Sequence, residues 1–154
     1  MRKKIFIISS IILFIDIISK RLVVNFMIED ESIEIIKNFF SLTYAKNEGV
    51  AFSLMDGYVP LIIVSTIIVL FMIFKYIKNN DISRSDIIGY SFVIGGAIGN
   101  LIDRVVYGYV VDFLDFNIFG YNYPIFNLAD TFIVVGVIIL IVFGRNGSNE
   151  VSSR

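Results

Sequence analysis

Long apolar stretches alternate with short polar segments along most of this chain of 154 residues. Four such stretches cover about residues 5–24, 58–77, 87–106 and 128–144. The hydrocarbon core of a bilayer is about 30 Å thick, so about 20 helical residues span it. The pattern predicts an all-α membrane protein with four transmembrane helices. No linker is long enough to divide the chain, so residues 1–154 are expected to form one domain.

Composition supports a membrane location and restricts the chemistry. Apolar residues make up 56% of the chain, against about 45–50% in soluble domains. The net charge of −1 gives no reason to expect nucleic acid as a partner. The chain has no cysteine and no histidine, which excludes thiol nucleophiles, Ser-His-Asp triads, disulfides and the usual zinc sites. Acid–base chemistry therefore falls to carboxylates, Lys or Tyr.

The first apolar stretch has the basic start of a secretory signal peptide. Two observations favour an uncleaved first span instead: Asp16, Lys20 and Arg21 follow the apolar run, and no small-residue cleavage site is present. Basic residues also set the orientation, since they favour cytoplasmic segments. Arg2, Lys3 and Lys4 precede the first span, and Lys75, Lys78 and Arg84 lie between the second and the third. Arg145 follows the fourth. Both termini are therefore predicted to be cytoplasmic, and the tail 146–154 is predicted to be disordered.

The two outer connections, 25–57 and 107–127, carry mostly acids. In the first, Phe40, Leu42 and Tyr44 alternate with polar or small residues, and Asn47-Glu48-Gly49 has turn chemistry before residues 50–52. This pattern predicts a small extracytoplasmic β-hairpin or sheet. The second connection is predicted to be a periplasmic-side loop, with Tyr and Phe side chains that suit the headgroup interface.

Polar and charged residues gather at the outer ends of the spans and in these connections. An ionisable group at the centre of a bilayer costs about 2.5–3.5 kcal/mol on insertion scales, so a group of them at one depth predicts a functional site. The candidates are Asp16, Lys20, Asn47, Asn100, Asp103, Arg104, Asp112, Asn127 and Asp130.

Several of these residues also have purely structural interpretations. Asp16 and Lys20 are four residues apart and can pair on one helix face, either to make the span insertable or to orient other polar groups. Asn100, Asp103 and Arg104 share a face at i, i+3 and i+4. They could close a helix end as a charge cluster, form the wall of a site, or do both. Residues 95–99 (Gly-Gly-Ala-Ile-Gly) favour close helix packing.

Asp112 and Asp130 together indicate a specific chemistry. Alone, Asn127 and Asp130 are a good helix start, with an N-cap and an acid in the first turn. Asp112, however, lies inside an apolar run, where no neighbour in sequence satisfies it. Two carboxyls held near each other share one proton: the ionised one can activate water while the protonated one protonates a carbonyl. The helix N-terminus predicts that Asp130 is the more readily ionised member.

Five segments, in order, are similar to the motifs of the bacterial lipoprotein signal peptidases, or signal peptidase II. These are Asp16-Ile-Ile-Ser-Lys20, Asn47-Glu-Gly-Val-Ala-Phe-Ser53, Gly95-Gly-Ala-Ile-Gly-Asn-Leu-Ile-Asp-Arg104, Val110-Val-Asp-Phe113 and Phe126-Asn-Leu-Ala-Asp130. The second segment departs from the family pattern, which often has two alanines and a final glycine where this chain has Val50-Ala51 and Ser53. The resemblance covers nearly the whole chain, including the four-span layout.

The resemblance implies an aspartyl endopeptidase with Asp112 and Asp130 as its catalytic pair. It implies that Asp16, Asn47, Asn100, Asp103, Arg104 and Asn127 line or support the site, to which we add Lys20 as the partner of Asp16. The substrates would be prolipoproteins carrying a diacylglyceryl group on a lipobox cysteine, cut just before that cysteine at the outer face of the bacterial cytoplasmic membrane. The resemblance implies neither a metal nor another cofactor. Besides the substrates, the expected partners are membrane lipid and globomycin-type inhibitors.

Two other classes of protein compete with this interpretation. A small ion-coupled transporter or proton conductor also uses intramembrane acids, but it predicts acids spread across the membrane depth and helices broken near the midplane. A structural subunit would not need two acids and two amides at one depth. The clustering of polar residues at one face favours the peptidase.

Overall fold

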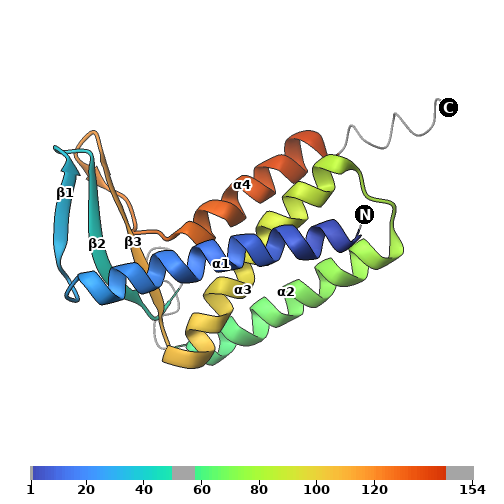
Figure 1. Cartoon of the computed structure of the whole chain (residues 1–154), viewed down its shortest axis with the longest axis horizontal. Helices are drawn as coiled ribbons and strands as arrows, with labels where there is room; N and C mark the ends of the chain where they lie inside the picture. The colour runs from blue at the N-terminus through green and yellow to red at the C-terminus, as the bar shows by residue number, and fades with distance from the viewer. Residues whose placement is uncertain (1, 50–57, 145–154) are drawn as a thin grey trace.

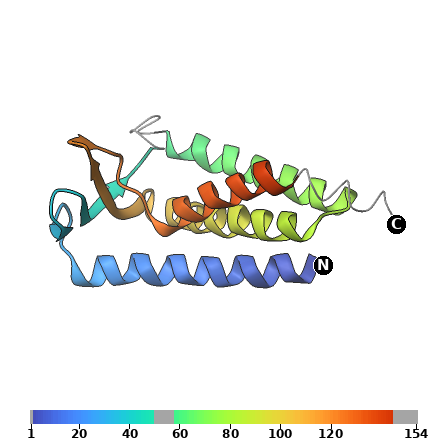
Figure 2. The ribbon, with the colours of Figure 1, turned by 90° about the horizontal axis from the view of Figure 1, so that it is seen from above.

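Four helices form an elongated body, and a small antiparallel sheet lies at one end of it (Figures 1 and 2). The computed structural model describes residues 2–49 and 58–144. The helices are α1 (Arg2–Phe26), α2 (Val59–Asn79), α3 (Arg84–Tyr107) and α4 (Leu128–Phe143). The strands are β1 (Ser32–Ile36), β2 (Phe40–Asn47), β3 (Val110–Ile118) and β4 (Tyr121–Asn122). Each predicted span corresponds to one helix, with ends shifted by a few residues, while the tail 146–154 lies outside the described residues.

Local sequence explains where the helices begin and end. Ser83 starts α3 with a capping box, in which its side chain accepts from the Asp86 N–H and Asp86 accepts from the Ser83 N–H. Asn127 caps α4 in the same way with Asp130, which confirms the helix start predicted there. The α3 helix stops at Gly108, whose φ of 82° lies in the left-handed region that glycine adopts without strain.

The four helices do not meet the criteria for a membrane span equally. Among the described residues, α2 and α3 are long and apolar enough to cross a bilayer. The α1 helix has 25 residues but carries charged residues within its length, and α4 is apolar but has only 16 residues. The observed architecture is therefore that of helices with a small sheet, and two of the four helices qualify as spans by length and composition.

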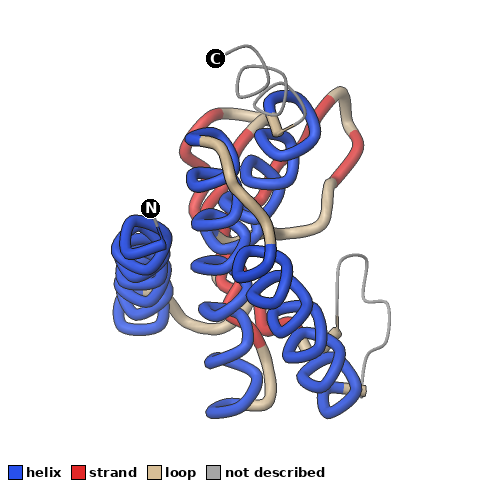
Figure 3. The backbone as a smooth tube through the Cα atoms, turned by 90° about the vertical axis from the view of Figure 1, so that its right-hand side faces the viewer, coloured by secondary structure: helices blue, strands red, loops and turns tan. Residues whose placement is uncertain are grey.

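The α3 helix is the centre of the bundle, with α1 along one side and α2 and α4 along others (Figure 3). Ten of its 24 residues are buried, whereas only three of the 21 residues of α2 are. Glycines allow this close packing: a Cβ at Gly96 would overlap the Ala129 carbonyl of α4, and one at Gly99 would overlap the Asp16 carboxylate of α1. The close helix approach predicted from residues 95–99 is thereby confirmed.

The sheet is larger than the sequence predicted. Its strand order is β1-β2-β3-β4, with antiparallel pairing throughout. The prediction of a loop over 107–127 is wrong, because residues 110–118 form β3, which pairs with β2 over residues 110–116 and with β4 at its end. The predicted hairpin does form, but β1 and β2 turn near Asn38, which has a φ of 57°. Residues 50–52, expected to follow a turn at Asn47, lie outside the described residues.

This arrangement brings the ends of distant elements together. The start of β3, the end of β2, the C-terminal half of α3 and the start of α4 meet where the sheet joins the helices (Figure 1). The opposite end of the body carries the start of α1 and the connection between α2 and α3 (Figure 2). All nine candidate residues lie at the sheet end.

Candidate active site

Hydrogen bonds and ion pairs join all nine candidate residues into one network. They come from α1, β2, α3, β3 and the start of α4, and several lie more than sixty positions apart in the sequence. The sequence predicted that these residues reach one depth, and the structure places them in direct contact. Two carboxyl groups, those of Asp112 and Asp130, face one cavity within this network.

Asp112 lies near the start of β3, in a run of four buried residues. Its side chain accepts one hydrogen bond from Asn47 Nδ2 at 2.8 Å and another from Asn127 Nδ2 at 2.6 Å. Burial raises the pKa of Asp112 to about 7, and the nearby Asp130 carboxylate acts in the same direction. The two amide hydrogen bonds and the more distant Lys20 favour the charged form and limit the rise of this pKa. Asp112 can therefore exchange a proton near neutral pH.

Asp130 occupies the first turn of α4, where its position is fixed from two sides. Its own N–H donates to Asn127 Oδ1 at 2.9 Å, and its carboxylate accepts from the Asn127 N–H at 3.3 Å. Asn100 Nδ2 of α3 donates to Asp130 Oδ1 at 2.7 Å. The capping interpretation is confirmed, and the same carboxylate that closes the helix start also lines the cavity.

Asn127 connects the two carboxyl groups and is completely buried. Its Nδ2 donates to Asp112 Oδ1 at 2.6 Å and to Asn100 Oδ1 at 3.1 Å, while its Oδ1 accepts from the Asp130 N–H. An amide can do this because it carries both a donor and an acceptor group. Asn127 thus holds Asp112 through its side chain and the start of α4, which carries Asp130, through the helix cap.

Behind this pair, Lys20 forms the centre of a buried charge cluster. Its Nζ lies 2.8 Å from Asp16, 3.0 Å from Asp103 and 2.9 Å from Asn100 Oδ1. The predicted ion pair between Asp16 and Lys20 is confirmed, and Asp103 joins it from α3. Asp16 also accepts the Ala129 N–H at 3.0 Å, so the cluster holds the start of α4 against α1.

Arg104 does not pair with Asp103, as the charge-cluster interpretation would require. Asp103 points to Lys20, whereas the Arg104 guanidinium lines the cavity and donates to the Gly49 carbonyl at 2.7 Å. Consecutive residues on a helix diverge by about 100°, which explains why the two side chains reach different partners. Arg104 thereby ties the segment after β2 to α3.

The cavity measures about 330 Å³ and extends from the two acids between α2 and α4. Apart from Thr66, its walls beyond the polar network are apolar. Sequence reasoning missed the contribution of α2, although the hydroxyl residues Ser65 and Thr66 interrupt an otherwise apolar run and could have drawn attention. The additional lining residues are Ile62, Thr66, Ala97, Val110, Pro124, Ile125, Phe126, Ile133 and Val134. Two carboxyls, one with a raised pKa, beside an apolar cleft can activate a water molecule against a bound peptide bond.

Comparison with known proteins agrees with this geometry. The family described as signal peptidase (SPase) II matches residues 8–144. The lipoprotein signal peptidase of Halothermothrix orenii is 43% identical over 140 residues, which cover 90% of this chain and 93% of that protein. The lipoprotein signal peptidase of Staphylococcus haemolyticus is 38% identical, covering 92% of this chain and 94% of that protein. A solved structure of a bacterial membrane enzyme superposes with a TM-score of 0.83 at 35% identity, covering 94% of this chain and 90% of that chain. The chain therefore belongs to the signal peptidase II family and is a membrane protease.

Proposed function

We propose that this protein removes the signal peptide from diacylglyceryl-modified prolipoproteins by an aspartyl mechanism. Asp112 and Asp130 are the catalytic residues, and the cut falls just before the lipidated lipobox cysteine. The observation that carries the proposal is the pair of carboxyls that line one cavity and are both held by Asn127, Asp112 through its side-chain amide and Asp130 through its backbone N–H. Relatives over most of this chain's length are named lipoprotein signal peptidases, which supports the substrate class.

In the proposed reaction the two acids share one proton. The ionised Asp130 takes a proton from a water molecule, whose oxygen attacks the scissile carbonyl carbon, while Asp112 gives its proton to the carbonyl oxygen. The resulting diol collapses as Asp130 returns a proton to the departing nitrogen and Asp112 regains its own. The C–N bond breaks and a carboxylic acid and an amine form. The pKa of about 7 at Asp112 supports its role as the protonated member. No metal or other cofactor takes part in these steps.

The remaining network residues orient this pair. Asn47 and Asn127 hold the Asp112 carboxyl, and Asn100 holds that of Asp130. In the cluster of Asp16, Lys20 and Asp103, Lys20 donates to Asn100, and Asp16 accepts from the Ala129 N–H at the start of α4. The cluster thereby holds both Asn100 and the start of α4 in place. Arg104, which lines the cavity, positions the chain at Gly49, two residues after Asn47.

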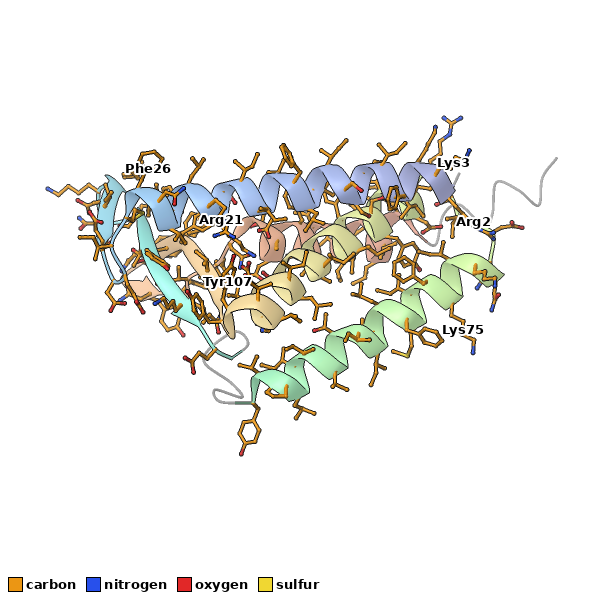
Figure 4. The ribbon with its side chains drawn as sticks, turned by 60° about the horizontal axis from the view of Figure 1, so that its bottom comes forward. Arg2, Lys3, Arg21, Phe26, Lys75 and Tyr107 are labelled. Carbon is orange, nitrogen blue, oxygen red and sulfur yellow. The ribbon has the colours of Figure 1, made fainter. Side chains whose placement is uncertain are left out.

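We propose that all four helices span the membrane, as one domain over residues 1–154. The charges that disqualify α1 by composition are largely hidden: Asp16 and Lys20 are 0% and 3% exposed and face α3, not lipid. Arg21, at the outer end, lies against the Tyr107 ring (Figure 4). At about 1.5 Å per residue, the 16 residues of α4 span about 24 Å, and local thinning of the bilayer accommodates a helix that is a few Å short. Large apolar side chains are exposed along α1 and α4, as lipid contact requires.

Basic residues lie at the start of α1, at the end of α2 and at the start of α3. Because basic residues favour the cytoplasmic side, they support an orientation with both termini in the cytoplasm. The sheet and the two acids then lie at the extracytoplasmic side of the bacterial cytoplasmic membrane. A cavity open between two lipid-facing helices, α2 and α4, allows a substrate helix to enter sideways from the bilayer. Globomycin-type inhibitors are proposed to occupy the same cavity. The transporter alternative finds no support, because the acids of the network gather at one end and the family is one of proteases.

Changing each acid to its amide tests the catalytic assignment. In Asp112→Asn and Asp130→Asn, we expect cleavage of a lipidated precursor in proteoliposomes to fall at least about 10²–10⁴-fold, the range of general acid–base catalysis. Asp115→Asn is the matched control, because Asp115 lies on the same strand and accepts from Thr43 away from the cavity. Cleavage at the parental rate in either of the first two variants would refute the proposal.

A further inference from the structure

A second cavity lies at the opposite end of the molecule, where α1, α2 and α3 meet. We call it the basal groove; it measures about 380 Å³, within the range of about 300–1,000 Å³ typical of ligand sites. Its floor is part of the buried core, formed by Ile5, Ile77 and Ile94. Phe6 and Phe74 line its sides, each with at least half of its side chain exposed.

The mouth of the basal groove is cationic. Arg2 donates to the Lys78 carbonyl at 2.7 Å, which brings the start of α1 to the last turn of α2, and both residues line the groove. Figure 4 shows Arg2 between these two helix ends, whereas Lys75 points away from the bundle. Among the described residues of this end, cationic side chains outnumber acidic ones by six to two. The cations are Arg2, Lys3, Lys4, Lys75, Lys78 and Arg84, and the acids are Asp81 and Asp86. Asp86 is already occupied by its capping contact with the Ser83 N–H.

An apolar cleft beneath a cationic rim matches an acyl chain attached to a negatively charged headgroup. A peptide segment in the same place would bury backbone N–H and C=O groups, which need hydrogen-bond partners in a membrane. The groove offers few: Ser9, one of its two hydroxyl residues, already donates to the Ser91 carbonyl at 3.0 Å. Hydrocarbon has no such requirement, so the lining favours a lipid chain over a protein partner.

We propose that the basal groove is a binding site for an anionic glycerophospholipid of the cytoplasmic leaflet. One acyl chain lies over Ile5, Ile77 and Ile94, and the phosphate lies between Arg2 and Lys78. The bound lipid bridges α1 and α2 beside Ile77, one of only three residues that α2 buries. The site is distant from Asp112 and Asp130 and does not depend on their catalytic assignment; it rests on the membrane placement of the helices.

The absence of tryptophan from the chain allows a direct measurement. The substitution Phe74→Trp places one fluorophore in the groove, and Phe71→Trp places one on the same helix outside the groove lining. Each full-length variant is reconstituted in phosphatidylcholine vesicles with increasing amounts of phosphatidylglycerol, with bromine on the acyl chains of one lipid or the other. Quenching of the indole fluorescence in the Phe74→Trp variant then reports which lipid occupies the groove.

We expect brominated phosphatidylglycerol to quench the Phe74→Trp variant at far lower mole fractions than brominated phosphatidylcholine, with no such preference in the Phe71→Trp variant. Each cation near an anionic lipid contributes about fivefold in affinity, so removing both Arg2 and Lys78 weakens the preference about thirtyfold at most. The test variant, made in the Phe74→Trp background, is Arg2→Gln with Lys78→Gln. Its control, Lys3→Gln with Lys4→Gln, removes the same charge at the same end from residues that do not line the groove.

Equal quenching of the Phe74→Trp variant by the two brominated lipids would overturn the proposal. An equal loss of preference in both double charge variants would also overturn it, because it would reveal only the general positive potential of this end. Precursor cleavage by the same samples verifies folding, and we expect it to remain at the parental rate. Repeating the quenching in an Asp112→Asn background separates the two proposals, since the lipid preference should persist there even though cleavage is lost.

Discussion

Replacing Lys20 with methionine tests how the buried charges of the network are tolerated. Lys20 lies 2.8 Å from Asp16 and 3.0 Å from Asp103, and all three side chains are less than a tenth exposed. Methionine keeps most of the side-chain volume but removes the charge, which leaves two carboxylates facing each other without a cation. Removing one partner of a buried ion pair typically costs about 3–5 kcal/mol. We expect a loss of at least that size, because two acids lose their partner.

Thermal unfolding in a mild detergent measures this loss. At about 2–4 °C per kcal/mol for a chain of this size, the midpoint should fall by about 6–20 °C. The control is Lys46→Met, which breaks an ion pair with Glu29 at the surface, where both side chains are at least a third exposed. Solvent screens such a pair, so the midpoint of the control should stay close to that of the parent.

A compensating variant separates charge from packing. Adding Asp16→Asn and Asp103→Asn to Lys20→Met removes every charge of the cluster while keeping similar volumes, and buried ionic groups replaced together often leave stability unchanged. Most of the lost midpoint should return. A single Lys20→Met variant as stable as the parent, or a triple variant no better than the single one, would refute the view that these charges stabilise each other.

Three further outcomes follow from the site. Cleavage should decline as the pH rises through about 7, because the pKa of Asp112 is raised to about 7 and its proton is needed by the carbonyl oxygen; a pH–rate profile flat from about 6 to about 9 would contradict this. In Asn47→Ala the alkaline limb should move to higher pH, since the lost hydrogen bond favoured the charged form of Asp112; a shift to lower pH would contradict the assignment. Gly99→Ala should destabilise the fold by about 1–3 kcal/mol, measured by thermal unfolding, because the new Cβ overlaps the Asp16 carboxylate; an unchanged midpoint would show that α1 can move away.

The features predicted correctly from the sequence depend on residues close together in the chain. Asn127 and Asp130, three positions apart, form a capping box, and Asp16 and Lys20 pair across one helical turn. Such contacts follow from helix periodicity alone. The same periodicity explains why four apolar runs of about twenty residues could be assigned to helices.

The contacts that sequence reasoning missed depend on how elements meet. Residues 110–113 are all buried, so the start of β3 lacks the alternation of a half-buried strand and its partner β2 could not be inferred. That Asp103, and not Arg104, faces α1 depends on the rotation of α3 relative to α1, which places Lys20 within reach of Asp103. The contribution of Thr66 depends likewise on where α2 lies relative to α4.

The division between helices and sheet has a physical basis in the chemistry proposed for this site. A carboxyl on a helix gains its partners from the next turn of its own helix or from neighbouring helices, and Lys20 pairs in these two ways with Asp16 of α1 and Asp103 of α3. Asp112 is instead carried by a strand, where Asn47 of the paired strand β2 supplies an amide from one side and Asn127 supplies another. These amides hold the carboxyl in place without adding a cation, which would lower its pKa. The sheet thus keeps one acid able to bind a proton near neutral pH, while the helices fix the second acid at the start of α4.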